Sequence, residues 1–562
     1  MNPANASLEG TLAYHQRSKH APQRFAASPA YMDWDTQPDP FRTWTGAERT
    51  ELPLVAEGVR TSYRELFSAE PASSRPLDLP SVSGFLELSL GLTAWKEYQG
   101  TRWALRADPS SGNLHPTEGY LITAGAPGLA GGVHHYLSRD HLLEQRCALD
   151  AAACEVLAAQ LGGTSFLVGL SSIHWREAWK YGERAFRYCQ HDVGHVIGTL
   201  RFAAAALGWS VRLLVGFGDR QVASLLGLDR EADHEQLDDA EREHPDCLLL
   251  VTTHAGQAVV PLAAKLESHA SALVDVVAAG SWSGRPSELS SEHLEWGAID
   301  QVADATRRAP SPNAPRWEAS QRAPLFPPSC ALPAQQIIRQ RRSAMSLDGK
   351  SSLPRDVFYA MLERTLPAKG VAPFDVLPFA PRLHLGIFVH LVEGIEPGLY
   401  IFERSEQVHA GLLEELGSEA PWTRPEGCPE GLRLFLLGAK DVRRAAQAVS
   451  CDQAIAADGA FSLGMIAEYR ETLARGAHHY RDLFWEAGLI GQTLYLEAEA
   501  AGLRGTGIGC YFDDAFHQLM GLESDRYQSL YHFTIGGPLE DTRLATLPAY
   551  AHLGPERTQL GD

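Results

Sequence analysis

The chain has 562 residues, of which 44% are hydrophobic and 21% are charged, so it is too long for one hydrophobic core and has the composition of a soluble globular protein. Its formal net charge of −20 disfavours a nucleic-acid partner, because so acidic a surface repels phosphate backbones. It contains no apolar run of about eighteen residues and no recognisable signal peptide, so we expect neither a membrane span nor export. None of its eight cysteines forms a C-x-x-C pair, which argues against structural zinc and indicates a reducing cytoplasm.

A polar loop is the first informative segment along the chain. Pro109-Ser110-Ser111-Gly112-Asn113 comes just before a strand expected to begin at Tyr120. Its hydroxyls and carboxamide offer hydrogen bonds at fixed geometry, and its glycine allows the backbone to approach a planar ligand closely. Composition alone leaves two interpretations open, a ligand-binding loop or an ordinary polar turn.

Lys180 and Tyr181 follow shortly before a long helix. An ammonium group can lower the pKa of a neighbouring phenol, and a phenolate can act as a base in dehydrogenation. The alternative is a helix start that packs through Trp175 and Trp179.

Two helices rich in small residues, expected at residues 188–208 and 484–502, align without gaps. The alignment places Arg187 on Arg481, Gly194 on Gly488, Leu200 on Leu494 and Gly208 on Gly502. Each helix ends in a glycine, as a C-cap requires. Small residues along one face let backbones approach closely, so we expect these helices at the interface between two halves of a tandem duplication.

Two further patterns in and after these helices do not predict the sites they first suggest. His191 and His195 have the spacing of a zinc helix, but Asp192 stands where a glutamate base is expected, so core histidines are the preferred interpretation and no metal is expected. The glycines of Gly505–Gly509 do not match the spacing of a dinucleotide-binding fingerprint.

The predicted architecture is α+β, with two fused domains and a connector. Prolines are frequent between residues 309 and 333, which is typical of a semi-rigid linker. We therefore expect a first domain at residues 1–265, a linker at 266–332 and a second domain at 333–562. Short apolar runs predict strands in both halves, at Tyr120–Thr123, Leu248–Thr253, Leu385–His390 and Leu432–Leu437.

The second domain begins with a group of basic residues. Arg341, Arg342 and Ser343 form a set that suits a dianionic phosphate, because guanidinium groups bind phosphate with two hydrogen bonds and a hydroxyl adds a third. The alternative is a solvated helix start. Gln16-Arg17-Ser18-Lys19 in the first half resembles this segment and supports the duplication.

Four motifs in one order resemble those of the nitroreductase family, in its SagB-type dehydrogenase branch. Pro109–Glu118 is similar to the family's flavin loop, and Arg341–Ser343 to its phosphate motif. Gly505–Asp514 resembles the loop whose backbone N–H groups face the flavin ring. Gly536-Gly537-Pro538 with Arg543 resembles the C-terminal segment that closes on the phosphate.

The resemblance implies one FMN between the halves of an internal pseudo-dimer. The complete site would combine Pro109, Ser110, Ser111 and Asn113 with Arg341, Arg342, Ser343, Gln492, Gly507, Ile508, Gly509 and Arg543. The mirror site departs from the pattern in three places: Gln16 replaces an arginine, Val211–Val215 has no glycine, and Leu377–His384 replaces the serine loop.

The expected function is an FMN-dependent oxidoreductase that transfers hydride to or from flavin N5. Lys180 and Tyr181 resemble the Lys-Tyr pair of SagB-type azoline dehydrogenases, and this resemblance implies that they are catalytic residues. Its substrate would be an azoline in a peptide, or a small metabolite, quinone or nitroaromatic reduced by NAD(P)H. The alternatives are a flavin-binding pseudoenzyme, a partner-binding protein without turnover and, least favoured, a zinc hydrolase. A fused pair already contains the family's dimer interface, so the default is a monomer.

Overall fold

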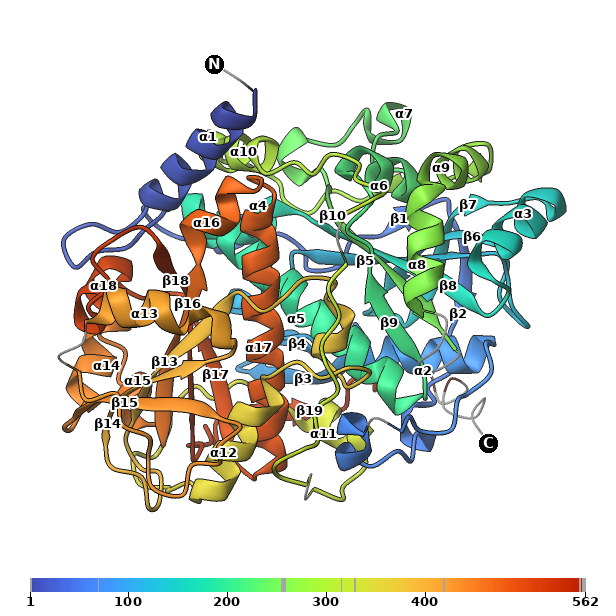
Figure 1. Cartoon of the computed structure of the whole chain (residues 1–562). Coiled ribbons are helices and arrows are strands. Elements are labelled where there is room, and N and C mark those ends of the chain that lie inside the picture. The colour runs from blue at the N-terminus through green and yellow to red at the C-terminus, as the bar shows by residue number, and fades with distance from the viewer. Residues whose placement is uncertain are drawn as a thin grey trace.

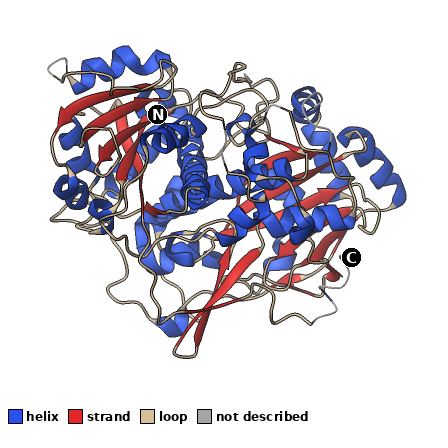
Figure 2. Ribbon diagram, turned by 90° about the horizontal axis from the view of Figure 1, so that it is seen from below, coloured by secondary structure: helices blue, strands red, loops and turns tan. Residues whose placement is uncertain are grey.

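The computed structural model describes residues 3–68, 70–253, 259–314, 316–327, 330–417, 420–554 and 557. Within these ranges, two large antiparallel sheets lie on either side of a central layer of helices (Figures 1 and 2). Each sheet comes from one half of the chain. The α+β architecture with two similar halves is therefore confirmed.

The two sheets have the same strand order over six strands. The first runs β7-β6-β5-β8-β10-β9, extended at β7 by β11 and β2, and the second runs β15-β14-β13-β16-β18-β17. All four predicted strands are present. The bounds in the first sheet are β2 (Glu48–Glu51), β5 (Thr117–Thr123), β6 (Gly132–Leu137), β7 (Leu142–Ala148), β8 (Ser165–Ser172), β9 (Ser210–Leu213), β10 (His244–Thr252) and β11 (Ser281–Trp282). Those in the second are β13 (Leu383–Val389), β14 (Gly398–Glu403), β15 (Arg433–Ala439), β16 (Phe461–Glu468), β17 (Arg504–Ile508) and β18 (Tyr527–Gly536).

Helices α5 (Ala185–Ala206) and α17 (His479–Ala500) cross between the sheets, each 22 residues long (Figure 1). The predicted alignment of Gly194 with Gly488 is confirmed, since the two glycines meet at the crossing. A Cβ on Gly194 would lie 2.4 Å from the backbone oxygen of Trp485, and a Cβ on Gly488 only 2.2 Å from that of His191. Equivalent residues thus meet at the axis relating the halves, as in an isologous interface.

Two buried ion pairs repeat this symmetry on either side of the crossing. Arg187 of α5 pairs with Asp513 at 2.7 Å, and Arg481 of α17 pairs with Asp219 at 2.7 Å. Each aspartate begins a short helix of the opposite half, α6 (Asp219–Leu226) or α18 (Asp513–Met520). Each half therefore holds the other through a desolvated charge pair. Removing one partner of such a pair costs free energy, because the other charge then stays buried without a partner.

The range expected as a linker, residues 266–332, contains regular elements in its first part. It includes the end of α8 (Val259–Ser268), then α9 (Ala270–Ala278), β11 and α10 (Gly297–Ala305). Leu266, Leu273 and Val277 recur at helical spacing and are buried against the first sheet, so this part belongs to the first half. The remaining helices are α1 (Pro3–Arg17), α2 (Leu79–Ser89), α3 (Ala151–Leu161), α4 (His174–Tyr181), α7 (Glu231–His234), α11 (Ala334–Gln340), α12 (Arg355–Arg364), α13 (His409–Leu416), α14 (Arg443–Val449), α15 (Ile455–Asp458) and α16 (Tyr469–Ala474).

Segments of each half extend onto the other. Strand β19 (Ala545–Leu547) from the end of the chain joins the hairpin of β3 (Leu92–Tyr98) and β4 (Thr101–Arg106) in a three-stranded sheet. At the other end, His15 of α1 hydrogen-bonds Tyr480 at 3.1 Å and Gln528 at 3.2 Å. The two halves therefore cannot separate without breaking sheet and helix contacts.

One predicted correspondence is wrong. Ser18 receives a hydrogen bond from Arg187 near the start of α5, whereas Ser343 contacts Tyr495 near the end of α17. The two segments therefore lie against opposite ends of the paired helices. Their similar sequences do not occupy equivalent places.

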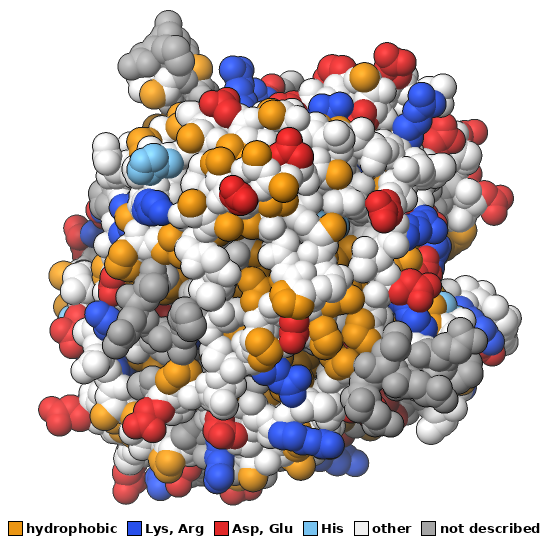
Figure 3. Space-filling model, turned by 90° about the vertical axis from the view of Figure 1, so that its right-hand side faces the viewer, with side chains coloured by type: hydrophobic (Ala, Val, Ile, Leu, Met, Phe, Trp, Pro, Cys, Tyr) orange, Lys and Arg blue, Asp and Glu red, His pale blue; other side chains and the backbone are white. Residues whose placement is uncertain are grey.

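One continuous apolar core spans the inner faces of both sheets and the crossing helices. Two smaller cores cover the outer faces of the sheets. Acidic and basic side chains are interspersed over the face shown in Figure 3. No helix in the described part of the chain combines the length and apolar character needed to cross a membrane.

Candidate active site

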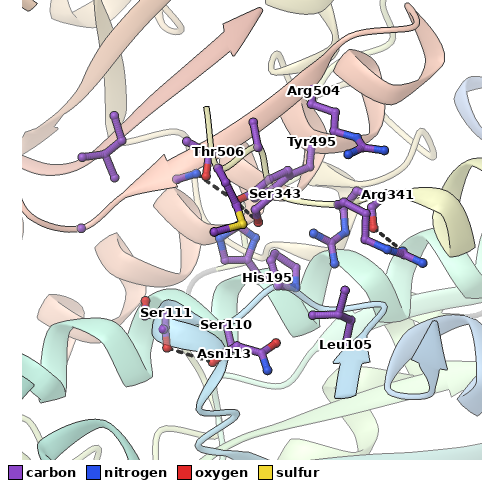
Figure 4. Close-up of a pocket in the computed structure, with 18 of the residues that line it drawn as sticks. Leu105, Ser110, Ser111, Asn113, His195, Arg341, Ser343, Tyr495, Arg504 and Thr506 are labelled. Atoms are coloured by element: carbon purple, nitrogen blue, oxygen red, sulfur yellow. Dashed lines mark hydrogen bonds between the residues drawn. The ribbon is translucent and has the colours of Figure 1, made fainter. Parts of the chain in front are cut away.

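A cavity of about 510 Å³ lies where the two halves meet, a volume in the range of small-molecule and cofactor sites. The first half supplies the serine loop, the β3–β4 hairpin and residues of α5, and the second supplies the start of its domain, α17, β17 and the segment before β19. In Figure 4 the serine loop and Arg341, Ser343 and Tyr495 lie on opposite sides of the cavity, with His195 between them. Ten predicted cofactor residues line it, namely Pro109, Ser110, Ser111, Asn113, Arg341, Arg342, Ser343, Gly507, Ile508 and Gly509.

The serine loop is held in an unusual backbone conformation between β4 and β5. Gly112 and Asn113 both have a φ of +60°, which an asparagine tolerates better than most residues. The loop is fixed internally, because Ser110 Oγ accepts a hydrogen bond from the backbone N–H of His115 at 2.8 Å. Asn113 donates to the backbone oxygen of Ala104 at 2.8 Å. Its geometry is therefore set before any ligand binds.

Arg341 brings an incompletely paired charge into the cavity wall. It follows α11, is 4% exposed, donates one hydrogen bond to the backbone oxygen of Arg106 at 2.9 Å and stacks on the ring of Tyr495. Its Nε has no hydrogen-bond partner among the described residues. Burial and the neighbouring Arg341 lower the pKa of Arg342 to about 10, so positive charge here exceeds nearby negative charge. A bound anion would pair with the guanidinium group of Arg341.

Ser343 and Tyr495 connect the arginine segment to the glycine segment. Ser343 Oγ and Tyr495 Oη are 2.9 Å apart, and the same phenol oxygen accepts the backbone N–H of Gly507 at 2.9 Å. The hydroxyl groups of both residues lie at the cavity.

The glycine segment is a strand, which corrects the prediction of a loop. Residues Arg504–Ile508 form β17, the edge strand that pairs with β18, and this pairing fixes an extended backbone. Aromatic neighbours explain the glycines. A Cβ on Gly507 would lie 1.8 Å from Tyr531 Oη, and one on Gly509 would lie 2.4 Å from the ring of Tyr188. Because these positions carry no side chain, a ligand in the cavity can approach the backbone of this segment closely.

Two predicted cofactor residues do not line the cavity. Arg543 is exposed and its guanidinium pairs with Asp541 at 2.7 Å. Gln492 is fully buried on α17, and neither of its amide atoms has a hydrogen-bond partner among the described residues. Two basic residues that the sequence analysis missed, Lys96 and Arg504, line the cavity instead. Arg504 directly precedes the glycine motif, and this position in the sequence could have identified it as a cavity residue.

The predicted catalytic pair lies at the serine loop, but its electrostatics differ from expectation. Tyr181 lines the cavity, and Lys180 Nζ is 3.3 Å from where a Cβ on Gly112 would lie. Burial, and then Glu177, raise the pKa of Tyr181 well above its usual value. The expected lowering by Lys180 is therefore wrong, because the carboxylates nearby oppose it.

The mirror position is largely filled. Its cavity has a volume of about 120 Å³. Arg201, which aligns with Tyr495, forms two 2.8 Å hydrogen bonds with Asp375, and Arg212 donates to the backbone oxygen of Trp317 at 2.8 Å. The carboxylate of Asp375 thus pairs with Arg201, and the backbone of the connector accepts from Arg212, whose Nε has no partner among the described residues.

The histidines of the apparent zinc motif have other partners. His191 Nε2 lies 3.0 Å from the backbone oxygen of Leu530, and His195 Nε2 lies 3.2 Å from Tyr531 Oη. Asp192, between them, turns into the cavity wall.

Parts of the sequence are similar to known proteins. Residues 431–537 match the model of the nitroreductase family. A putative nitroreductase of Methanocaldococcus jannaschii is 25% identical over 171 residues, which cover 30% of this chain and 80% of that protein. The trifolitoxin-processing protein TfxB of Rhizobium leguminosarum bv. trifolii is 29% identical over 192 residues, covering 32% of this chain and 51% of that protein.

A solved structure matches nearly the whole chain. The crystal structure of a putative nitroreductase from Anabaena variabilis has a TM-score of 0.67 at 21% identity, covering 94% of this chain and 99% of that one. The two-part fold is therefore shared along the full length of the Anabaena protein. The chain thus has the fold of that putative nitroreductase and carries a segment matching the nitroreductase family in its second half.

Proposed function

We propose that the protein is an FMN-dependent oxidoreductase with one flavin site at the junction of its halves. The observation that carries the proposal is the buried guanidinium of Arg341, which has an unpartnered Nε at a cavity shared by both halves. The residues present fit a flavin phosphate at this end, since Arg341, Arg342 and Arg504 supply charge and Ser343 a hydroxyl.

The rest of the cavity suits the remainder of the flavin. The serine loop offers hydroxyl and amide groups on one wall, and the glycine strand β17 offers backbone on the other. Bound FMN would supply hydride chemistry at N5. The chain itself binds, orients and desolvates the reactants, and backbone N–H groups stabilise negative charge on the ring.

The substrate class belongs to the same proposal. Similarity to a trifolitoxin-processing protein favours a SagB-type dehydrogenase acting on a peptide azoline. Similarity to a putative nitroreductase favours reduction of a quinone or nitroaromatic at the expense of NAD(P)H. In either direction Tyr181, with Lys180 beside it, would contact the substrate at the serine loop.

The fused interface also supports a monomer, and the free cysteines of the described chain suit a cytoplasmic protein. Size-exclusion chromatography with light scattering tests the first of these.

The experiment for the function itself is anaerobic reduction of FMN-loaded protein by NADH or NADPH, followed by reoxidation with menadione or nitrofurazone. Arg341→Ala should retain much less flavin than wild type and should lose both reactions in proportion. Protein that binds FMN but is neither reduced nor reoxidised by any donor or acceptor, azoline peptides included, would favour a flavin-binding pseudoenzyme.

A further inference from the structure

Two carboxyl groups approach the serine loop from the side away from the arginines. Glu177 on α4 is fully buried, and Asp192 on α5 is 3% exposed. Ser110 Oγ lies 3.5 Å from Glu177 Oε1, and the backbone N–H of Ser111 donates to Asp192 Oδ1 at 3.3 Å. The same short loop therefore connects both acids, and Asp192 reaches the cavity.

Each acid keeps one oxygen without a hydrogen-bond partner. Among the described residues, Glu177 Oε2 and Asp192 Oδ2 are buried and unpartnered, and neither side chain forms an ion pair. A buried polar atom normally finds a partner, because leaving it unpaired costs free energy. An oxygen in this state is suited to hold a proton or to accept one from a ligand.

The surroundings disfavour ionisation of both acids at once. Burial, and repulsion from Asp192, raise the pKa of Glu177 well above its usual value, while burial raises that of Asp192. Burial of both groups and the repulsion between them oppose the doubly ionised state, so the two acids together keep a proton near neutral pH. The other titratable or charged groups that face the pair are Asp108, Lys180, Tyr181, Cys189 and Tyr531, of which only Lys180 is a cation.

We propose that Glu177 and Asp192 form the acid–base pair of this site and exchange one proton with the substrate during hydride transfer. In oxidation the substrate gives a hydride, two electrons and one proton, to the flavin, and gives its second proton to the pair. The pair then changes from one bound proton to two, and reduction of a substrate is the reverse. The inference rests on the proposed flavin site, and it assigns Tyr181 to positioning, since a phenol with a raised pKa is a poor base.

The first readout needs no flavin. Infrared titration of the FMN-free protein should reveal a protonated carboxyl that persists at pH 8. The double variant Glu177→Gln/Asp192→Asn should remove it, whereas each single variant keeps one carboxyl whose burial still raises its pKa. Asp246→Asn is the matched control: this buried aspartate is satisfied by Ser172 and Gln190 and does not line the cavity.

The second readout is the two-electron midpoint potential of bound FMN against pH, above the pH at which reduced FMN becomes an anion. If the pair takes up a proton when FMN takes up two electrons, the equilibrium constant for FMN reduction changes about a hundredfold per pH unit, which shifts the midpoint potential by about 59 mV. One proton alone gives about tenfold, or about 30 mV. The midpoint potentials of wild type and Asp246→Asn should change by about 59 mV per pH unit, the steeper line. Those of Glu177→Gln and Asp192→Asn should change by about 30 mV per pH unit, the shallower line.

The outcomes separate the two proposals. If FMN does not bind, the proposed function fails, and the infrared titration still decides whether the pair holds a proton. If FMN binds but wild type shows no protonated carboxyl at pH 8 and follows the shallower line, the pair is overturned while the flavin site stands. Both wild-type readouts decide the matter even where a variant does not fold.

Discussion

Replacing Gly488 with alanine tests whether the helix crossing holds the two halves together. The new Cβ would lie 2.2 Å from the backbone oxygen of His191 and 2.8 Å from the Cα of Gly194. Both are backbone atoms of a buried helix, so no side chain can move aside. Normal contacts between such atoms need about 3.5 Å, so the helices must separate by about 1 Å over their crossing.

The cost follows from overpacking a close-packed interface, about 1–3 kcal/mol, against a gain of at most about 1 kcal/mol from helix propensity. Gly488→Ala should therefore lower the urea midpoint of unfolding. Gly297→Ala at the start of α10 is the control, because a Cβ there meets nothing within 4 Å. Equal midpoints for both variants would refute the reasoning, since the crossing would then tolerate a methyl group.

Three other predictions concern the site, the interface and pH. Arg341→Ala should weaken FMN binding about 10- to 100-fold by isothermal titration, as expected for lost charge-assisted hydrogen bonds, whereas the exposed Arg543→Ala should change it less than about twofold. Asp513→Asn should destabilise by about 3–5 kcal/mol in urea unfolding, because it leaves two buried arginines without their counter-charge, whereas the neighbouring, exposed Asp514→Asn should cost less than about 1 kcal/mol. Burial opposes protonation of His135, but hydrogen bonds to two glutamates outweigh it and raise its pKa to about 9. Its contribution of about 3 kcal/mol should be fully present below about pH 6.5 and lost as pH rises through 9, and His135→Asn should remove this pH dependence of the unfolding free energy; an unchanged dependence would contradict the assignment.

Periodic and gapless patterns allowed much of the fold to be predicted. The alignment of the two long helices was correct to the residue because an uninterrupted helix preserves spacing, and the glycines that align are those that meet at the crossing. The linker was placed too early, since most of its prolines lie between residues 309 and 333 and Leu266, Leu273 and Val277 pack on the first sheet. The predicted match between the Ser18 and Ser343 segments was wrong, because a similarity of only four residues does not fix where a segment lies along a neighbouring helix.

At the site, the motifs identified the segments that converge but not every side chain that faces inward. Arg543 was expected at the phosphate, but a single arginine in an irregular segment has no pattern that fixes its direction, and it turns to Asp541. Asp192 was considered only as the residue that stands where a zinc motif has its glutamate base, and its approach to the serine loop depends on a contact between residues 81 positions apart. The pKa of Tyr181 could not be predicted from Lys180 alone, because burial, and then Glu177, raise it, and both depend on the fold.

The central claim is one flavin between two unequal halves, and the flavin content of the purified protein tests it most directly. Protein saturated with FMN, freed of excess by gel filtration and denatured by heat should release about one FMN per chain, and Arg341→Ala protein should release almost none. Two FMN per chain would contradict the account, because the mirror position, where Arg201 is bound to Asp375, would then also hold a cofactor. No FMN at all would remove the flavin site and leave only the shared fold.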